Sequence, residues 1–116
     1  MKNILLLGAT GSIGKSVLSV IKQNQDELNL MGISFNTNIL KGTEIIEQFS
    51  PSYVHIENVS CFQEEKFFDT CSYINTPSEL EDLINHKEVD INICAISGFA
   101  GLKAAYMAAS SGKKIL

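Results

Sequence analysis

The stretch GATGSIGKS, residues 8–16, constrains the fold of this 116-residue chain more than any other segment. It begins at the end of NILLLG, residues 3–8, whose continuous apolar run ending in glycine is typical of a strand buried on both faces. It opens residues 12–23, which predict an amphipathic helix with one core-facing stripe. The apolar positions of that stripe are Ile13, Val17, Val20 and Ile21. A glycine-rich turn between a buried strand and a helix is typical of nucleotide-binding βαβ units.

The same stretch nearly fits two phosphate-binding patterns, and Ala9 separates it from both. With Gly14 as the last glycine, the P-loop G-x-x-x-x-G-K-[ST] and the dinucleotide pattern G-x-G-x-x-G both require glycine at position 9. A P-loop also needs an acid at the end of a second strand to organise magnesium. Asp90 begins its predicted strand, and the third strand offers only Glu57. We therefore favour a dinucleotide site on the variant G-x-x-G-x-x-G, formed by Gly8, Gly11 and Gly14.

Each glycine of this variant has an expected role. The first lets the chain turn out of the strand, the second lets a pyrophosphate approach the backbone, and the third lets the helix pack closely on the sheet. The pyrophosphate is expected on the N–H groups of Ser12 and Ile13, where the helix dipole also favours negative charge. Thr10 and Ser12 add hydroxyl donors. The alternative is a tight turn that binds nothing.

The end of the second predicted strand, residues 28–35, indicates which dinucleotide would bind. NAD sites typically place an acid about 20 residues past the glycines, to bind the ribose 2′-hydroxyl. Residues 34–38, SFNTN, contain no acid, and this permits the 2′-phosphate of NADP. The side chains there that can donate to a phosphate are Ser34, Asn36, Thr37 and Asn38. Asn38 is also a plausible cap for a helix at 38–49, and the two roles can coexist.

The rest of the chain alternates between short β-rich runs and helical stretches. Further strands are expected at residues 53–57, 72–75, 89–96 and 113–116, and further helices at 60–69, 76–84 and 101–112. Pro51 should end the second helix, and Thr76 with Glu79 forms a capping box for the helix at 76–84. This alternation predicts an α/β fold: a Rossmann-like, doubly wound, mainly parallel sheet with helices on both faces.

Two features near the end of the chain leave alternatives open. Gly98, in SGFAGL after the fifth strand, would let backbone lie against a nicotinamide, although a glycine-rich helix entry explains it equally well. The final KKIL looks like the start of a strand. We therefore expect the chain to be one domain, residues 1–116, cut from a longer protein. The alternative is an edge strand that completes the domain.

Composition excludes several other classes of protein. The net charge is −4 and the nine Lys and Arg residues are scattered, so no nucleic-acid partner is expected. Three cysteines without a C-x-x-C pair argue against disulfides or zinc, and Cys94 is expected in the core. The two histidines, His55 and His86, are expected to be ordinary residues. No apolar run approaches the roughly 20 residues of a membrane helix. The amino-terminal apolar run, Ile4 to Leu7, is too short for a signal peptide, so a cytoplasmic location is expected.

Several motifs together resemble the 1-deoxy-D-xylulose 5-phosphate reductoisomerase family. They are LLLGATGSIGKSVLSVI, the asparagine of NTNI, FSPSYVHIEN and AISGFAGLKAAYMAASSGKKIL. The resemblance covers the whole chain and implies an N-terminal NADPH-binding Rossmann domain. It implies that residues 10–13 hold the pyrophosphate and that Asn38 lies at the 2′-phosphate. The family often has Gly-Lys-Asn where this chain has residues 36–38, Asn-Thr-Asn, so a direct lysine contact with that phosphate is missing.

The resemblance also implies what a longer protein would do. The family isomerises a sugar phosphate and reduces it with NADPH to 2-C-methyl-D-erythritol 4-phosphate, in the non-mevalonate route to isoprenoids. It uses Mg²⁺ or Mn²⁺, and a homodimer is expected at full length. The metal ligands and catalytic residues lie in a following domain, so none is expected here and the chain alone should be inactive. The expected cofactor contacts are Gly8, Thr10, Gly11, Ser12, Ile13, Asn36, Thr37, Asn38 and Gly98.

Two other functions remain open at this point. One is another NAD(P)-dependent oxidoreductase, such as a semialdehyde dehydrogenase, whose catalytic cysteine would lie further along. The other is a non-catalytic module that senses dinucleotide level, although the missing acid argues against NADH.

Overall fold

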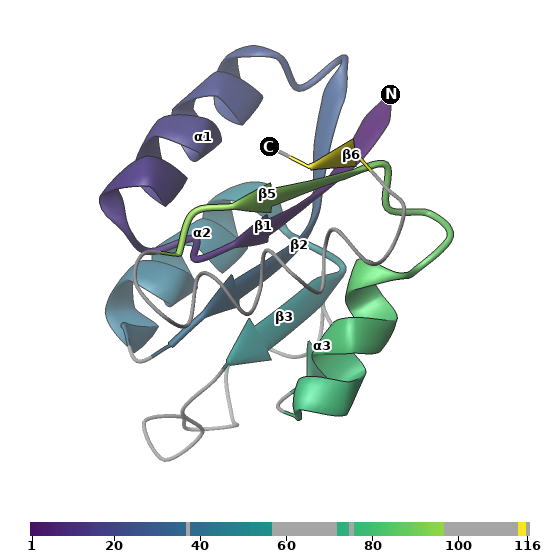
Figure 1. Cartoon of the computed structure of the whole chain (residues 1–116). Helices are drawn as coiled ribbons and strands as arrows, with labels where there is room; N and C mark the ends of the chain where they lie inside the picture. The colour runs from purple at the N-terminus through teal and green to yellow at the C-terminus, as the bar shows by residue number, and fades with distance from the viewer. Residues whose placement is uncertain (37, 57–71, 75, 97–113, 116) are drawn as a thin grey trace.

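The computed structural model describes residues 1–36, 38–56, 72–74, 76–96 and 114–115. Strands and helices alternate from residue 2 to residue 56 (Figure 1). The strands are β1 (Lys2–Leu7), β2 (Leu28–Phe35), β3 (Tyr53–Ile56), β4 (Ser72–Ile74), β5 (Ile91–Cys94) and β6 (Lys114–Ile115). The helices are α1 (Ser12–Gln23), α2 (Ile39–Phe49) and α3 (Pro77–Ile84).

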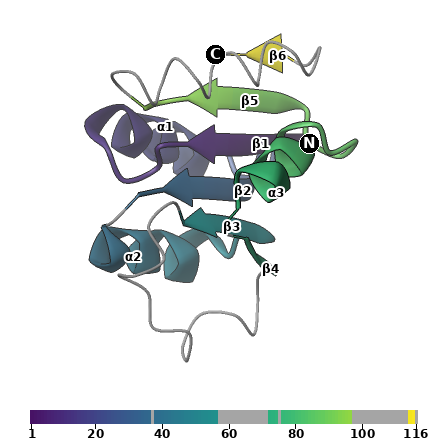
Figure 2. The same cartoon turned by 60° about the horizontal axis from the view of Figure 1, so that its bottom comes forward.

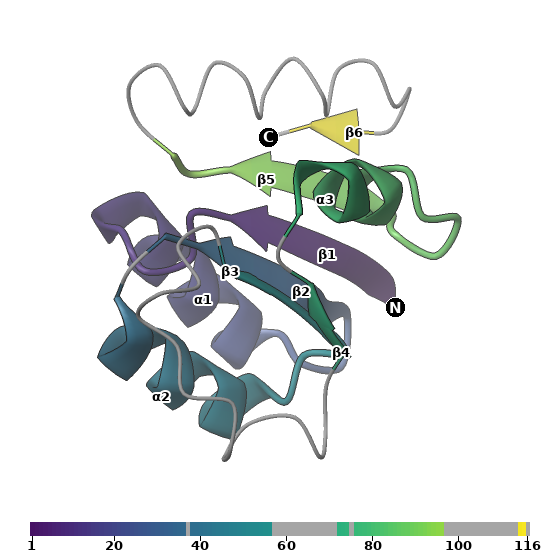
Figure 3. The same ribbon diagram turned by 90° about the horizontal axis from the view of Figure 1, so that it is seen from below.

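The strands form one parallel sheet in the order β4-β3-β2-β1-β5-β6 (Figure 2). The chain first builds outward from β1 through β2 and β3, and then returns to the other side of β1 to form β5. Helices α1 and α2 cover one face of the sheet and α3 covers the other (Figure 3). The predicted doubly wound, parallel α/β fold is therefore confirmed.

Strand β1 is buried on both faces, as its unbroken apolar run predicts. Successive strand side chains point to opposite faces. Accordingly, Ile4 and Leu6 pack in the cluster under α1 and α2, while Leu5 and Leu7 pack in the cluster under α3. All four are at most 2% exposed. The central strand thus joins the two halves of the core, and its carboxyl end leads directly into the glycine turn.

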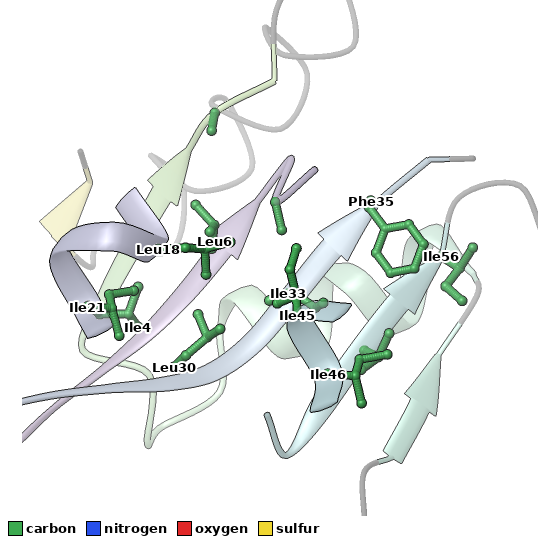
Figure 4. Packing of buried hydrophobic residues seen from close by; sticks show 13 residues of the cluster. Ile4, Leu6, Leu18, Ile21, Leu30, Ile33, Phe35, Ile45, Ile46 and Ile56 are labelled. Atoms are coloured by element: carbon green, nitrogen blue, oxygen red, sulfur yellow. The ribbon is translucent and has the colours of Figure 1, made fainter. Parts of the chain in front are cut away.

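Helix α1 has the predicted bounds, but the predicted core-facing stripe is partly wrong. Its buried residues are Gly14, Leu18 and Ile21, and Figure 4 shows the latter two beside β1. Ile13 is 58% exposed and Val20 is 54% exposed. The reason is that Gly14 packs against the preceding turn, and this fixes the rotation of the helix about its axis.

The predicted caps of the other two helices are present. The Asn38 side chain accepts a hydrogen bond from the Lys41 amide at 3.1 Å, and α2 ends at Phe49, before Pro51. The Thr76 hydroxyl accepts from the Glu79 amide at 3.2 Å and donates to its carboxylate at 2.8 Å. The helices expected at 60–69 and 101–112 lie outside the described residues.

Strand β2 has the predicted bounds, and β5 is shorter than predicted at both ends. The described parts of β3, β4 and β6 lie within their predicted ranges. No helix in the described ranges is long and apolar enough to cross a membrane.

Candidate functional site

The turn after β1 is fixed by the fold itself. Gly8 has φ +85°, in the left-handed region that side chains other than glycine rarely adopt. A Cβ there would lie 2.7 Å from the Ile96 side chain and 2.8 Å from the Ala95 carbonyl carbon. The Gly8 and Ala9 amides both donate to the Ser34 carbonyl of β2, at 2.8 and 2.9 Å. The first glycine therefore turns the chain out of the strand, as predicted.

The turn delivers the amino end of α1 to the carboxyl edge of the sheet. Gly11 caps the helix with extended backbone (φ −81°, ψ 178°), and its carbonyl accepts from the Lys15 amide at 2.9 Å. No side chain caps this end. The amides of Ser12 and Ile13 make no hydrogen bond to another described residue, and both residues are exposed. Such amides, together with the helix dipole, favour an anion.

The other two glycines of the motif differ in what surrounds them. A Cβ on Gly14 would lie 2.5 Å from the Ala9 carbonyl oxygen and 2.6 Å from that of Gly8. Gly14 therefore lets α1 pack closely against the turn at residues 8 and 9. The prediction was close packing of the helix on the sheet. A Cβ on Gly11 would meet only ordinary contacts, at 3.7 and 3.8 Å. The described chain itself does not require glycine there, so the space above Gly11 is available to a ligand.

The end of β2 departs from the prediction at Ser34. Its hydroxyl is hydrogen-bonded to Nδ1 of His55 at 2.9 Å, and both residues are buried. Because Ser34 is only 3% exposed, its hydroxyl does not reach a ligand, and its proposed contact with a phosphate is wrong. Asn36 and Asn38 are exposed. Thr37 lies outside the described residues.

The turn and the end of β2 lie side by side because the strands are parallel and adjacent. Leu7, the last residue of β1, is in register with Ser34 of β2 on one side and with Cys94 of β5 on the other. The strand order reverses at β1, and ligands of open α/β sheets bind at such a switch point. The structure thus brings together the residues at 8–13 and Asn36 and Asn38, whereas Gly98 lies outside the described residues.

Sequence reasoning missed the part that Ser34 and His55 play in the site. Ser34 holds the glycine turn through its carbonyl, and any residue type supplies a carbonyl, so no sequence signal marks it. His55 was expected to be an ordinary residue, and its buried ring is hydrogen-bonded to the Ser34 hydroxyl.

Other candidate chemistry is sparse in the described part of the chain. Cys94 is half-buried, and burial raises the pKa of its thiol. It packs against the cluster under α3, close to its expected core position. Within the described ranges, no group of three or more His, Cys, Asp and Glu side chains is placed to hold a metal ion.

Comparison with known proteins connects this geometry to one family. The family model of 1-deoxy-D-xylulose 5-phosphate reductoisomerase matches residues 4–116. The enzymes of that name from Ruthia magnifica and Bacillus subtilis are each 36% identical to the chain, over 100% and 99% of its length. The chain spans 31% of each of these relatives.

Solved structures show the same arrangement. A reductoisomerase in complex with NADPH, fosmidomycin and magnesium superposes with a TM-score of 0.88 at 26% identity, over 99% of this chain and 29% of the other. The Zymomonas mobilis enzyme in complex with NADPH gives 0.85 at 26% identity, over 98% and 31%. From its amino-terminal strand to its last residue, this chain belongs to the 1-deoxy-D-xylulose 5-phosphate reductoisomerase family.

Proposed function

We propose that residues 1–116 are the NADPH-binding domain of a 1-deoxy-D-xylulose 5-phosphate reductoisomerase. The observation that carries this proposal is the uncapped amino end of α1, whose Ser12 and Ile13 amides stand exposed beside Gly11. The fold supplies a positively polarised surface there and leaves space for a phosphate. Relatives that superpose on this chain were solved with NADPH.

Each residue of the site has a proposed role. The Ser12 and Ile13 amides bind the pyrophosphate, with hydroxyl donation from Thr10 and Ser12. Gly8 shapes the turn and Gly11 leaves the backbone accessible. At the end of β2, residues 36–38 (Asn36, Thr37 and Asn38) lie at the 2′-phosphate, where the absence of an acid avoids repulsion. Gly98 lies beside the nicotinamide half of the cofactor.

Bound NADPH supplies the hydride that reduces the isomerised sugar phosphate to 2-C-methyl-D-erythritol 4-phosphate. The domain would bind and orient that cofactor at the carboxyl edge of the sheet. The sugar phosphate and the Mg²⁺ or Mn²⁺ that polarises its oxygens would bind to the remainder of the protein, which we propose to be a cytoplasmic homodimer. Magnesium accompanies NADPH in one of the superposed relatives. The match to a single family favours this function over a semialdehyde dehydrogenase or a sensing module.

Calorimetric titration of the chain with NADPH and, separately, with NADH tests the proposal. We expect both to bind and NADPH to bind more tightly. Preference for NADH, or binding of neither, would overturn the cofactor assignment. We also expect no turnover of 1-deoxy-D-xylulose 5-phosphate by the chain alone. Measurable turnover would overturn the proposed division of the enzyme into a cofactor part and a catalytic part.

A further inference from the structure

A groove of about 220 Å³ runs between α1 and α2 on the face of the sheet that both helices cover. We call it the lysine groove, because Lys15 and Lys22 of α1 and Lys41 of α2 line it. Glu44 is the one acidic residue of its lining, so three positive charges face one negative charge. Leu18 and Ile45 form part of its apolar wall. An anion is therefore favoured in or beside this groove.

The three lysines lie at different distances from the cofactor turn. Helices α1 and α2 both follow parallel strands of one sheet, so both begin at its carboxyl edge. Lys15 lies in the first turns of α1, and Lys41 is the third residue of α2. Lys22 lies in the last turn of α1. Lys22 lies seven residues beyond Lys15, which is about 10 Å along the helix axis. Only Lys15 and Lys41 lie at the end where the cofactor turn begins.

Lys41 is tied directly to the end of β2. Its amide donates to the side chain of Asn38, one of the residues proposed at the 2′-phosphate. Its ammonium lies 3.7 Å from the Glu44 carboxylate, and its side chain is 39% exposed. That distance is longer than a charge-assisted hydrogen bond, and exposed pairs of this kind are weak. A doubly charged phosphate would therefore compete successfully with Glu44 for the ammonium.

We propose that Lys41, supported by Lys15, supplies the positive charge that selects the 2′-phosphate of NADPH. The assignment rests on the proposed function and names its specificity-determining residue. It accounts for a domain that has neither an acid nor a lysine at residues 36–38. In this chain, the positive charge would come from Lys41 in the first turn of α2 and from Lys15 on α1, across the groove.

The test compares three matched variants, Lys41→Met, Lys15→Met and Lys22→Met, each of which removes one charge from the same groove. Dissociation constants for NADPH and NADH are measured by calorimetry at low and at physiological ionic strength, and thermal melts confirm that each variant folds. We expect Lys41→Met to weaken NADPH binding about tenfold and NADH binding less than twofold. Lys15→Met should weaken NADPH binding about threefold. At physiological ionic strength, Lys22→Met should change neither affinity by more than about twofold, because Lys22 lies about 10 Å from Lys15 along the helix, beyond the Debye length of about 8 Å.

Glu44→Gln gives a test in the opposite direction. Removing the competing carboxylate should strengthen NADPH binding about two- to threefold and leave NADH binding unchanged. The proposal is overturned if Lys41→Met weakens both dinucleotides equally, or if Lys22→Met matches it. Failure of the unchanged chain to bind NADPH is a separate result that overturns the proposed function itself.

Discussion

Replacing Gly14 with alanine tests how the helix of the cofactor site is held. The new methyl carbon would lie 2.5 Å and 2.6 Å from two carbonyl oxygens and 2.7 Å from a carbonyl carbon, all in the backbone of residues 8 and 9. Ordinary contact begins near 3.4 Å, so turn and helix must separate by about 0.9 Å. The turn cannot yield easily, because its amides are bonded to the Ser34 carbonyl.

The expected cost follows from two opposing effects. Overpacking of this kind costs about 3 kcal/mol when backbone has to move. Alanine recovers about 1 kcal/mol through its better helix propensity. The net loss is therefore about 2 kcal/mol, and thermal unfolding followed by circular dichroism should show a melting temperature lower by roughly 8 °C.

Gly11→Ala is the matched control, since it adds the same methyl group to the same motif. Its nearest contacts would be 3.7 and 3.8 Å, and its φ of −81° suits any residue. We expect less than about 1 kcal/mol of lost stability, from the poorer cap, but at least tenfold weaker NADPH binding, because the methyl occupies the phosphate's path. A Gly14→Ala variant that melts within about 2 °C of the unchanged chain, or a Gly11→Ala variant that is equally destabilised, would contradict this role of Gly14.

Three further changes test other parts of the structure. Ser34→Ala should lower stability by about 1–2 kcal/mol in urea unfolding, because it removes the hydroxyl bonded to the His55 ring, while NADPH affinity stays within about twofold; a large selective loss of affinity would restore Ser34 as a cofactor contact. Thr76→Ala should cost about 1 kcal/mol, since it removes both hydrogen bonds to Glu79, and a loss below about 0.3 kcal/mol would refute the cap's role. Burial raises the pKa of Cys94 above its ordinary 9.0, so the unfolded chain ionises first as pH rises. The contribution of the neutral Cys94 thiol to the free energy of unfolding should therefore be fully present below pH 9.0 and decrease above it. A Cys94→Ala variant should lack that decrease.

Local patterns predicted the elements of this fold because the relevant interactions are local. The cap at Thr76 and the stop before Pro51 each depend on residues within one helical turn, and both are observed. The alternation of strands and helices then leaves few topologies other than a parallel sheet. The order of the strands comes from the structure, because local patterns do not determine which strands become neighbours.

Side-chain environments were harder to predict because they depend on how one element packs against a turn or strand outside it, and a helical or alternating pattern does not record that packing. Ile13 and Val20 fit a helical stripe, yet the rotation of α1 is set by the carbonyls that Gly14 touches. Gly42 resembles a flaw in α2, but a Cβ there would overlap the Phe35 ring of β2, so the glycine makes room for the core. Neither contact leaves a periodic signal in the sequence.

The three glycines of the motif are unequal evidence for a ligand. Gly8 and Gly14 are required by positive φ and by backbone contacts within the described chain, so a domain of this fold would keep them even if it bound nothing. Of the three, Gly11 alone has no such requirement within the described residues, and it adjoins the Ser12 and Ile13 amides, which bond to no other described residue. Residues 11–13 are therefore the part of the motif that indicates a bound pyrophosphate, and a change confined to them should separate cofactor binding from folding.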